Sequence, residues 1–363
     1  MSLETLGWGP AFEHAFSTLV SQSPLSLVPG RVVRQHRGLL TVQTATRTLL
    51  ARTAGRLLHQ APGVESLPTI GDWVALQLPD GDGEALLHAV LPRSSVLARR
   101  EAGSERDGQL IAANLDVVVL VAGLDGNFNP RRIERALALA WTSGASPVVV
   151  LTKADLRPDA DSLVAEVEEL APGVPVLALS SWTGEGIEAL RAQLPAGKTG
   201  ALLGSSGVGK STLVNRLLGE ARLLTQAVRA EDDKGRHTTT HRELFVLPGG
   251  GLLIDGPGMR ELGLWGEDDG NGIGQTFTDI LELAADCRFT DCQHQREPGC
   301  AVRAAVSSGA LPEARLASYE RLRREQAYQV RQRSASAERD HRRHERSKTL
   351  MGWEATRSKR RRD

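Results

Sequence analysis

The segment Gly204-Ser-Ser-Gly-Val-Gly-Lys-Ser211 decides the fold of the region around it. Its spacing, G-x-x-x-x-G-K-S, is typical of a phosphate-binding P-loop, in which glycines let successive backbone amides turn toward one anion. A strand-like apolar run at 200–203 precedes the segment and a helix-like run at 212–218 follows it, which is the context that a P-loop requires. We expect a nucleotide to contact Gly204, Ser205, Ser206, Gly207, Val208, Gly209, Lys210, Ser211 and Thr212.

Two side chains of this loop carry the chemistry of phosphate binding. We expect Lys210 to place its positive charge on the β and γ phosphates, which gives it a catalytic contribution, and Ser211 to offer its hydroxyl to Mg²⁺. A second part of the metal site is predicted at Asp255, which follows the apolar run 251–254 and would hold Mg²⁺ through water. Gly258, three residues later, would present its amide to the γ-phosphate.

The stretch Thr152-Lys-Ala-Asp155 predicts which base is bound. The Asp155 carboxylate can accept hydrogen bonds from both the ring N–H and the exocyclic amine of guanine, and adenine offers no such pair. Lys153 can lie along the face of the base. The stretch resembles the guanine signature NKxD, with Thr152 in place of the asparagine that normally braces the P-loop. The sequence therefore predicts GTP or GDP as the ligand, with Mg²⁺.

The order of these motifs departs from that of an ordinary GTPase, in which the P-loop comes first. Ser180 and Ser181 begin a loop similar to the fifth GTPase motif, whose backbone supports Asp155 and the guanine carbonyl. This loop and the guanine signature both precede Gly204, whereas Asp255 comes last. That order predicts a circularly permuted GTPase domain. Continuous apolar runs alternate with helical stretches here, as in a mostly parallel sheet covered on both faces; the runs are 116–122, 147–151, 174–179, 200–203 and 251–254.

The residues ahead of this domain alternate short β-like runs with turn signals. Asp80-Gly-Asp-Gly83, between the last two runs, is typical of a hairpin turn. Five short strands in about seventy residues fit a small barrel of the OB-fold type, although an SH3-like barrel would give the same pattern. No dense basic or aromatic face identifies its role, so nucleic-acid binding, protein contact and plain packing stay open. The expected strands are 30–34, 38–42, 47–51, 71–76 and 85–90.

All three cysteines of the chain fall within fourteen residues, in the pattern Cys287-x4-Cys292-x-His294-x5-Cys300. Three thiolates and one imidazole at this spacing fit a closed tetrahedral Zn²⁺ site of structural character, because a catalytic zinc would keep one position open. An odd, clustered set of cysteines also favours metal ligation in a reducing compartment over disulfides.

The net charge of zero conceals an uneven distribution. Residues 321–363 hold 15 Lys and Arg against 6 Asp and Glu and few apolar residues, which predicts a basic helix that fades into a tail able to pair with phosphate backbones. A solvated charged end without a partner would look the same. The apolar runs fall short of a membrane span, and Glu4 and Glu13 argue against a secretory signal. We therefore expect a cytoplasmic monomer without membrane contact.

Taken with the motif order and the Cys/His spacing, two further stretches carry a family resemblance. Gly235-Arg-His-Thr-Thr-Thr240 and Asp255-Gly-Pro-Gly-Met-Arg-Glu-Leu-Gly-Leu-Trp265 resemble the RsgA family of circularly permuted small-subunit biogenesis GTPases. The resemblance implies an OB-fold, a permuted GTPase domain and a zinc domain. It also implies binding to the small (30S) ribosomal subunit and its rRNA late in maturation, with GTP hydrolysis stimulated by that subunit. By analogy, His237 would orient the hydrolytic water and Thr239 would sense Mg²⁺.

The expected division of the chain follows from these motifs. Two other functions remain open: a P-loop ATPase or kinase, against which Asp155 argues, and a nucleotide-dependent RNA-binding protein with little turnover. The polar stretch 235–243 suits a mobile switch loop, and a β-edge is the other interpretation. The predicted parts are an N-terminal arm (1–27), an OB-fold-like barrel (28–99), the permuted GTPase domain (112–264), a mostly helical zinc-binding domain (265–320), and a basic helix and tail (321–363).

Overall fold

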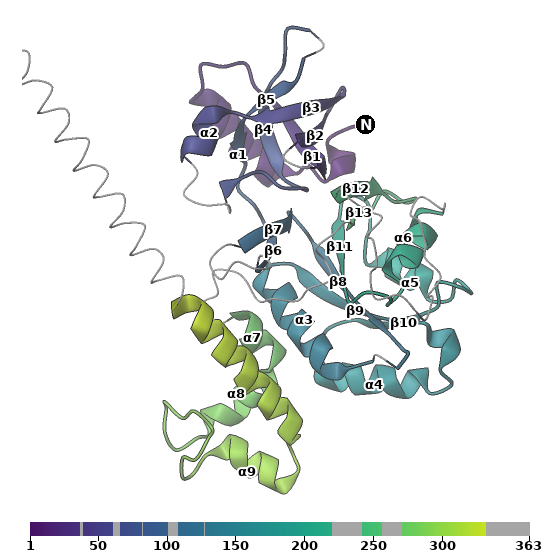
Figure 1. Ribbon diagram of the computed structural model, residues 1–363, viewed down its shortest axis with the longest axis vertical. Coiled ribbons are helices and arrows are strands. Elements are labelled where there is room, and N and C mark those ends of the chain that lie inside the picture. Colours follow the sequence, from purple (N-terminus) through teal and green to yellow (C-terminus); the bar gives the residue numbers. More distant parts are fainter. Residues whose placement is uncertain are drawn as a thin grey trace, which may run out of the picture.

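The computed structural model describes residues 1–36, 39–60, 66–81, 83–100, 108–126, 128–219, 242–255 and 271–331. Within these ranges, no helix is both long enough and apolar enough to cross a membrane. The described chain forms a barrel, an α/β domain and a group of C-terminal helices (Figure 1).

The N-terminal barrel closes on itself through five strands. They are β1 (Val28–His36), β2 (Leu39–Thr44), β3 (Thr48–Thr53), β4 (Trp73–Gln77) and β5 (Ala85–Val90), with α2 (Gly55–Gln60) between β3 and β4. Pairing runs β1-β2-β3-β5-β4 and returns from β4 to β1, with β3 parallel to β5 and all other pairs antiparallel. This closed arrangement confirms the predicted five-stranded barrel and favours the OB-fold over the SH3-like alternative. Val32, Val42, Val74, Leu76 and Leu87 fill its interior.

The central domain has a six-stranded sheet in the order β10-β9-β8-β11-β13-β12. Its strands are β8 (Val117–Gly123), β9 (Ser146–Thr152), β10 (Val176–Leu179), β11 (Thr199–Leu203), β12 (Arg242–Val246) and β13 (Leu252–Asp255), and only β12 runs antiparallel to its neighbour within this domain. This confirms the predicted α/β domain. Its guanine-motif strands precede the P-loop strand in the chain, so the permuted order is built into the topology.

Helices cover both faces of this sheet because successive strand residues point to opposite sides. Along β8, Val118 and Leu120 pack with one cluster, whereas Val119 and Val121 pack with another. The first cluster includes α3 (Pro130–Thr142) and α4 (Ala160–Leu170), and the second includes α5 (Ile187–Ala192) and α6 (Lys210–Leu218). The loop after β9 contains the short η3 (Ala154–Leu156).

The barrel and the α/β sheet are joined edge to edge, which the sequence did not predict. Strand β12 pairs with β1 of the barrel, so the two sheets form one eleven-stranded sheet. Arg34 of β1 also forms an ion pair with Glu243 of β12. Arg242 and Glu243 were predicted as the end of a polar switch loop, and they instead belong to a strand; residues 235–241 of that loop lie outside the described residues.

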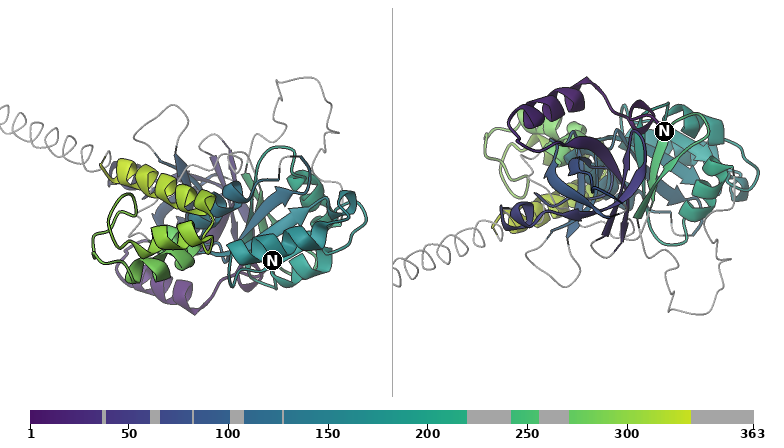
Figure 2. Two further views of the ribbon diagram at one scale, coloured as in Figure 1. Left: turned by 90° about the horizontal axis from the view of Figure 1, so that it is seen from below. Right: turned by 90° about the horizontal axis from the view of Figure 1, so that it is seen from above.

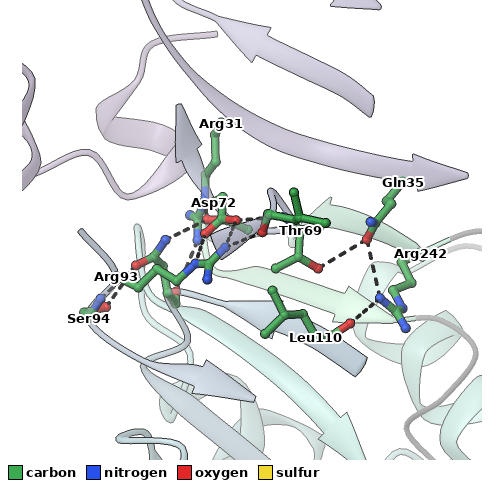
Figure 3. Close-up of polar contacts among 11 residues, drawn as sticks. Arg31, Gln35, Thr69, Asp72, Arg93, Ser94, Leu110 and Arg242 are labelled. Atoms are coloured by element: carbon green, nitrogen blue, oxygen red, sulfur yellow. Dashed lines mark hydrogen bonds and ion pairs between the residues drawn. The ribbon is translucent and has the colours of Figure 1, made fainter. Parts of the chain in front are cut away.

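A buried polar network fixes this junction (Figure 3). Asp72 accepts two hydrogen bonds from Arg93, each 2.7 Å long. Arg31 is 1% exposed and donates to the carbonyl oxygens of Leu6, Gly71 and Asn114, which belong to the N-terminal segment, the barrel and the α/β domain. Burial lowers the pKa of Arg31 to about 10, despite the nearby carboxylates, so the guanidinium stays charged at neutral pH.

Two features of the N-terminal half lie outside the predicted pattern. The arm folds as η1 (Glu4–Leu6) and α1 (Pro10–Ser21), and the Trp8 ring meets the Trp73 ring edge-on at 4.7 Å between centroids. Strands β6 (Val96–Arg100) and β7 (Gly108–Ala113) form a separate antiparallel hairpin between the barrel and the α/β domain.

The C-terminal part is helical, as predicted. It contains α7 (Asn271–Thr276), α8 (Thr278–Ala285), α9 (Ala301–Ser308) and a helix at 313–331, and α7 lies beside α3 (Figure 1; Figure 2 gives two further views). Arg315 makes the central contact, because it bonds to the Glu134 carboxylate of α3 at 3.0 Å and to Asp279 of α8 at 2.6 and 2.8 Å. The basic tail at 332–363 lies outside the described residues.

Candidate nucleotide site and metal-ligand cluster

The predicted P-loop joins β11 to α6, at the carboxyl edge of the sheet. Gly207 and Gly209 have φ angles of +79° and +93°, a region that L-residues with side chains rarely adopt. A Cβ atom on Gly204 would lie 2.3 Å from the Val121 carbonyl oxygen, so only glycine fits there. Buried leucines and Val214 anchor α6, and its N-terminus points its free amides at the loop. The loop therefore has the backbone geometry of an anion cradle.

Lys210 opens α6 and folds back over the loop. Its ammonium donates to the carbonyl oxygens of Gly204 at 2.5 Å and Ser205 at 2.6 Å. These contacts keep the positive charge at the mouth of the cradle, where a bound phosphate would replace carbonyl oxygens as its partner. Ser211 and Thr212 follow in the first turn of the same helix.

Thr152 ends β9 and is buried beneath the P-loop, at 2% exposure. Its hydroxyl donates to the Val208 carbonyl oxygen at 2.6 Å, with the Ala122 oxygen further away at 3.3 Å. The brace that asparagine gives in the common guanine signature is therefore present here in a shorter form. Because one hydroxyl carries one hydrogen, Thr152 has no donor left for the base.

Lys153 bonds both to the P-loop and to Asp125, a residue that the sequence did not identify. Its ammonium donates to Asp125 at 2.6 Å and to the Gly207 carbonyl oxygen at 2.9 Å, and its own φ is +64°. Asp125 lies just beyond the end of β8, where side chains of this sheet converge on the ligand edge, and that position was the available signal.

The two guanine-motif loops leave the sheet side by side. Strands β9 and β10 are parallel, with Thr152 opposite Leu179, so Asp155 in η3 and the loop that begins at Ser180 emerge at the same edge. Ser180 is buried, and its hydroxyl accepts a hydrogen bond from the Thr183 amide at 3.1 Å. The Ser181 hydroxyl is enclosed without a partner among the described residues. Asp155 is exposed at the mouth, with its carboxylate available to a ligand.

Of the remaining residues predicted to contact the nucleotide or its metal, Asp255 lies within the described ranges and three others lie outside them. Asp255 ends β13 next to the P-loop strand, which is the position expected for a residue facing Mg²⁺. Gly258, His237 and Thr239 lie outside the described residues. The structure therefore brings together the P-loop, both guanine motifs and Asp255 at one edge of the sheet.

The four predicted metal ligands converge in the C-terminal helical part. The ligand atoms of Cys287, Cys292, His294 and Cys300 all lie within 4.8 Å of one another. Cys287 Sγ lies 3.8 Å from Cys300 Sγ and 3.7 Å from His294 Nδ1, and Cys300 Sγ lies 3.5 Å from that nitrogen. A tetrahedron with Zn–S of about 2.3 Å and Zn–N of about 2.0 Å needs S–S and S–N separations of about 3.8 and 3.5 Å. The cluster therefore could hold one zinc ion.

Protonation at the cluster also suits a metal. Burial, with a further contribution from Arg323, lowers the pKa of His294, which favours the neutral imidazole that ligates metals. Burial raises the pKa of the Cys292 thiol to about 11, so a cation is needed to hold that sulfur as a thiolate.

A carboxylate organises the loop between the ligands. Glu297 accepts hydrogen bonds from the amides of Gln293, Gln295 and Arg296 at 3.1, 2.8 and 2.9 Å. Together with the Glu297 amide, which contributes most, these amides lower the pKa of the carboxyl group to about 2. No distinctive pattern in the sequence identifies Glu297, an acid three residues from each of two predicted ligands.

Comparison with known proteins relates the whole chain to one group. A family model described as RsgA GTPase matches residues 90–265. The small ribosomal subunit biogenesis GTPase RsgA of Opitutus terrae is 50% identical in an alignment of 351 residues, and the match covers 94% of this chain and 95% of that protein. The protein of that name from Streptomyces coelicolor is 47% identical over 362 residues, 99% of this chain and 96% of that protein.

Solved structures show the same architecture. YjeQ from Thermotoga maritima has a TM-score of 0.61 at 28% identity and covers 82% of this chain and 97% of its own. YloQ, described as a circularly permuted GTPase, has a TM-score of 0.57 at 24% identity and covers 84% of this chain and 96% of its own, which shows likeness of fold.

Proposed function

Since this chain belongs to the RsgA GTPase family, we propose that it binds and hydrolyses GTP in the biogenesis of the small ribosomal subunit. The match to named relatives carries this function, and the geometry of the sheet edge supports it. Relatives named for that role match nearly the whole chain at about half identity, and the P-loop, the guanine motifs and Asp255 share one sheet edge. The relatives' names also favour hydrolysis over the alternative of an RNA-binding protein with little turnover.

GTP binding is divided between two sets of residues. The P-loop amides and Lys210 hold the phosphates, and Asp155 accepts from the guanine edge while the loop at Ser180 and Ser181 supports it. Thr152 and Lys153 tie these two halves together through Val208 and Gly207, because both bond to P-loop carbonyl oxygens. Binding of the base thus positions the phosphates, which is how a site of this type lowers a phosphoryl-transfer barrier.

Ser211 and Asp255 are the residues that would hold Mg²⁺, which neutralises charge on the β and γ phosphate oxygens when bound. We assign His237 the role of orienting the attacking water, Thr239 that of sensing the metal and Gly258 that of donating its amide to the γ-phosphate. The roles of His237 and Thr239 follow from the family resemblance, that of Gly258 follows from its position three residues after Asp255, and all three stay predictions.

The Cys287, Cys292, His294 and Cys300 cluster is proposed as a structural zinc site, supported by the tetrahedral spacing of its atoms. With all four positions filled by protein, the ion would stabilise the fold and take no part in hydrolysis. The basic segment 321–363 is proposed to contact rRNA in the small subunit, supported by its excess of nine positive charges. Action as a cytoplasmic monomer is part of the same proposal.

The deciding experiment measures GTP turnover of the full chain with and without purified small ribosomal subunits. We expect slow turnover alone, on the order of 10⁻⁴ per second, and strong acceleration by the subunits. Lys210→Ala should abolish both rates. His237→Ala should lose the acceleration while it keeps GTP and subunit binding. Equal rates for the wild type and Lys210→Ala would refute the enzymatic function.

A further inference from the structure

The Trp182 side chain stands out on the surface of the molecule. It is 87% exposed, and no other large apolar side chain within the described ranges reaches that value. Its indole makes no ring contact, cation–π contact or hydrogen bond to the described residues. An indole buries a large area when it finds a partner. Trp182 therefore has an entire ring available to a ligand.

The sheet register places this residue at the guanine motif. Thr152 of β9 lies opposite Leu179 of β10, and Asp155 and Trp182 each follow three residues later. Because the two strands are parallel, both residues lie just beyond the same edge of the sheet. The P-loop leaves that edge as well, since β8 pairs with β9 on one side and with β11 on the other.

The loop that carries Trp182 is a fixed turn. The Gly184 amide donates to the Ser180 carbonyl oxygen at 2.9 Å, and the Ser180 amide donates to the Glu185 oxygen at 3.0 Å. Arg216 of α6 supports it from the P-loop side, because a Cβ atom on Gly184 would lie 2.8 Å from its guanidinium. The indole is thus held on an ordered turn next to α6, the helix that follows the P-loop.

The side chains that begin the guanine motif are engaged with the P-loop and with Asp125. The Thr152 hydroxyl donates to Val208, and the Lys153 ammonium is held by Asp125 and Gly207. The single Thr152 hydrogen is used, and the Lys153 ammonium is directed at Asp125 and the P-loop, so Asp155 is the exposed polar group that meets the edge of a base. Trp182, on the neighbouring loop at the same sheet edge, is an exposed aromatic side chain that can cover a face of such a base.

We propose that the Trp182 indole stacks on the guanine base and forms one wall of the nucleotide pocket. This inference rests on the proposed GTPase function and adds the residue that contributes base affinity in this chain. Stacking of a base on an aromatic side chain is sequence-tolerant, so Trp182 strengthens binding while Asp155 selects guanine.

The test measures GDP and GTP binding by the purified full chain. We expect Trp182→Ala to weaken both nucleotides by the same factor, about 5- to 150-fold, because the base is common to them. Trp182→Phe keeps a flat ring and should stay within about threefold of the wild type. The KM for GTP should rise in Trp182→Ala by more than kcat changes. Addition of GDP should quench more tryptophan fluorescence in the wild type than in Trp182→Phe, because only the wild type has an indole at this position.

Tyr328→Ala is the matched control, because Tyr328 is an exposed aromatic residue, 41% accessible, on the C-terminal helix. It should bind nucleotides like the wild type. If Trp182→Ala also binds GDP like the wild type, the stacking role is overturned while the GTPase function stands. Normal nucleotide binding with lost attachment to the small subunit would make Trp182 a partner contact instead. A wild type that binds no guanine nucleotide would refute the proposed function itself.

Discussion

Thr152 shows how a single hydroxyl can serve where a larger amide is usual. Its oxygen donates to the Val208 carbonyl at 2.6 Å, at a position with 2% exposure. A buried carbonyl oxygen that loses its donor costs about 1–3 kcal/mol. The sequence could identify the departure from NKxD, but the replacement brace depends on how closely the P-loop backbone approaches β9. Only the folded structure contains that distance.

We expect Thr152→Val, which keeps the shape and removes the hydroxyl, to lower the free energy of unfolding by about 1–2 kcal/mol. GDP affinity should fall with it, because the P-loop loses a brace. Denaturant unfolding and equilibrium GDP binding measure the two effects. Thr152→Ser retains the hydroxyl and serves as the control. If Thr152→Val matches Thr152→Ser in both measurements, the brace has no energetic role.

Asp155 carries the predicted choice of base. Asp155→Asn exchanges one carboxylate acceptor for an amide donor and leaves a guanine N–H poorly paired. A loss of about 1–3 kcal/mol in GTP binding is expected, with no equal loss for ATP. Competition of ATP against labelled GTP measures the selectivity in both forms. Unchanged GTP affinity in Asp155→Asn would show that another group reads the base.

At the scale of elements, helix α3 links the nucleotide edge to the C-terminal helices. It begins shortly after Asp125, the partner of Lys153, and its Glu134 is fully buried against Arg315. Continuous apolar runs alternating with helical stretches predicted the sheet strands and the helices between them, since those patterns are local. The Glu134–Arg315 pair joins residues 181 positions apart, and no local pattern reports such a contact. The β12–β1 pairing was missed for the same reason.

We expect Arg315→Leu to destabilise the protein by about 3–5 kcal/mol, because Glu134 would keep its buried charge and lose a partner. Arg131 still bonds to Glu134, which places the value toward the lower end. Chemical denaturation of the full chain measures the change. Arg135→Ala is the control, since the Arg135–Glu325 pair joins the same elements through side chains that are 28% and 26% exposed and should contribute at most about 1 kcal/mol. Equal effects of the two variants would contradict the assignment.

At the scale of the whole molecule, the two faces of the α/β sheet pack in two separate hydrophobic clusters. The α5 and α6 face of the sheet, which supports the P-loop, forms one cluster, and the α3 face shares the other with the C-terminal helices. The P-loop helix α6 and the Cys/His cluster therefore pack in different cores, whereas Ala154 of the guanine motif packs against the same core as the C-terminal helices. The four ligand positions were predicted from spacing alone because all of them lie within one short segment. Their connection to α3 through Arg315 required the fold.

This division determines what loss of the metal should do. The wild type should hold one zinc per chain, and closed sites of this kind contribute roughly 10–16 kcal/mol of apparent binding free energy at neutral pH. Cys292→Ala should lose the zinc and unfold α8, α9 and the loop between them. GDP binding should change only slightly, because α6 and the P-loop pack in the separate cluster. Metal analysis, helix content and GDP affinity of the same preparations measure the three effects.

Two further variants separate ligation from loop packing. Phe289 lies between the ligands Cys287 and Cys292, is 40% exposed and is not a ligand. The Phe289→Ala variant should therefore retain full zinc. Glu297→Gln keeps the size of the side chain but lacks the charge that gathers three loop amides, so it should bind zinc more weakly while the four ligands remain. Full zinc occupancy in Cys292→Ala would remove Cys292 from the ligand set. Equal loss of GDP binding and of zinc in that variant would mean that the two cores unfold as one.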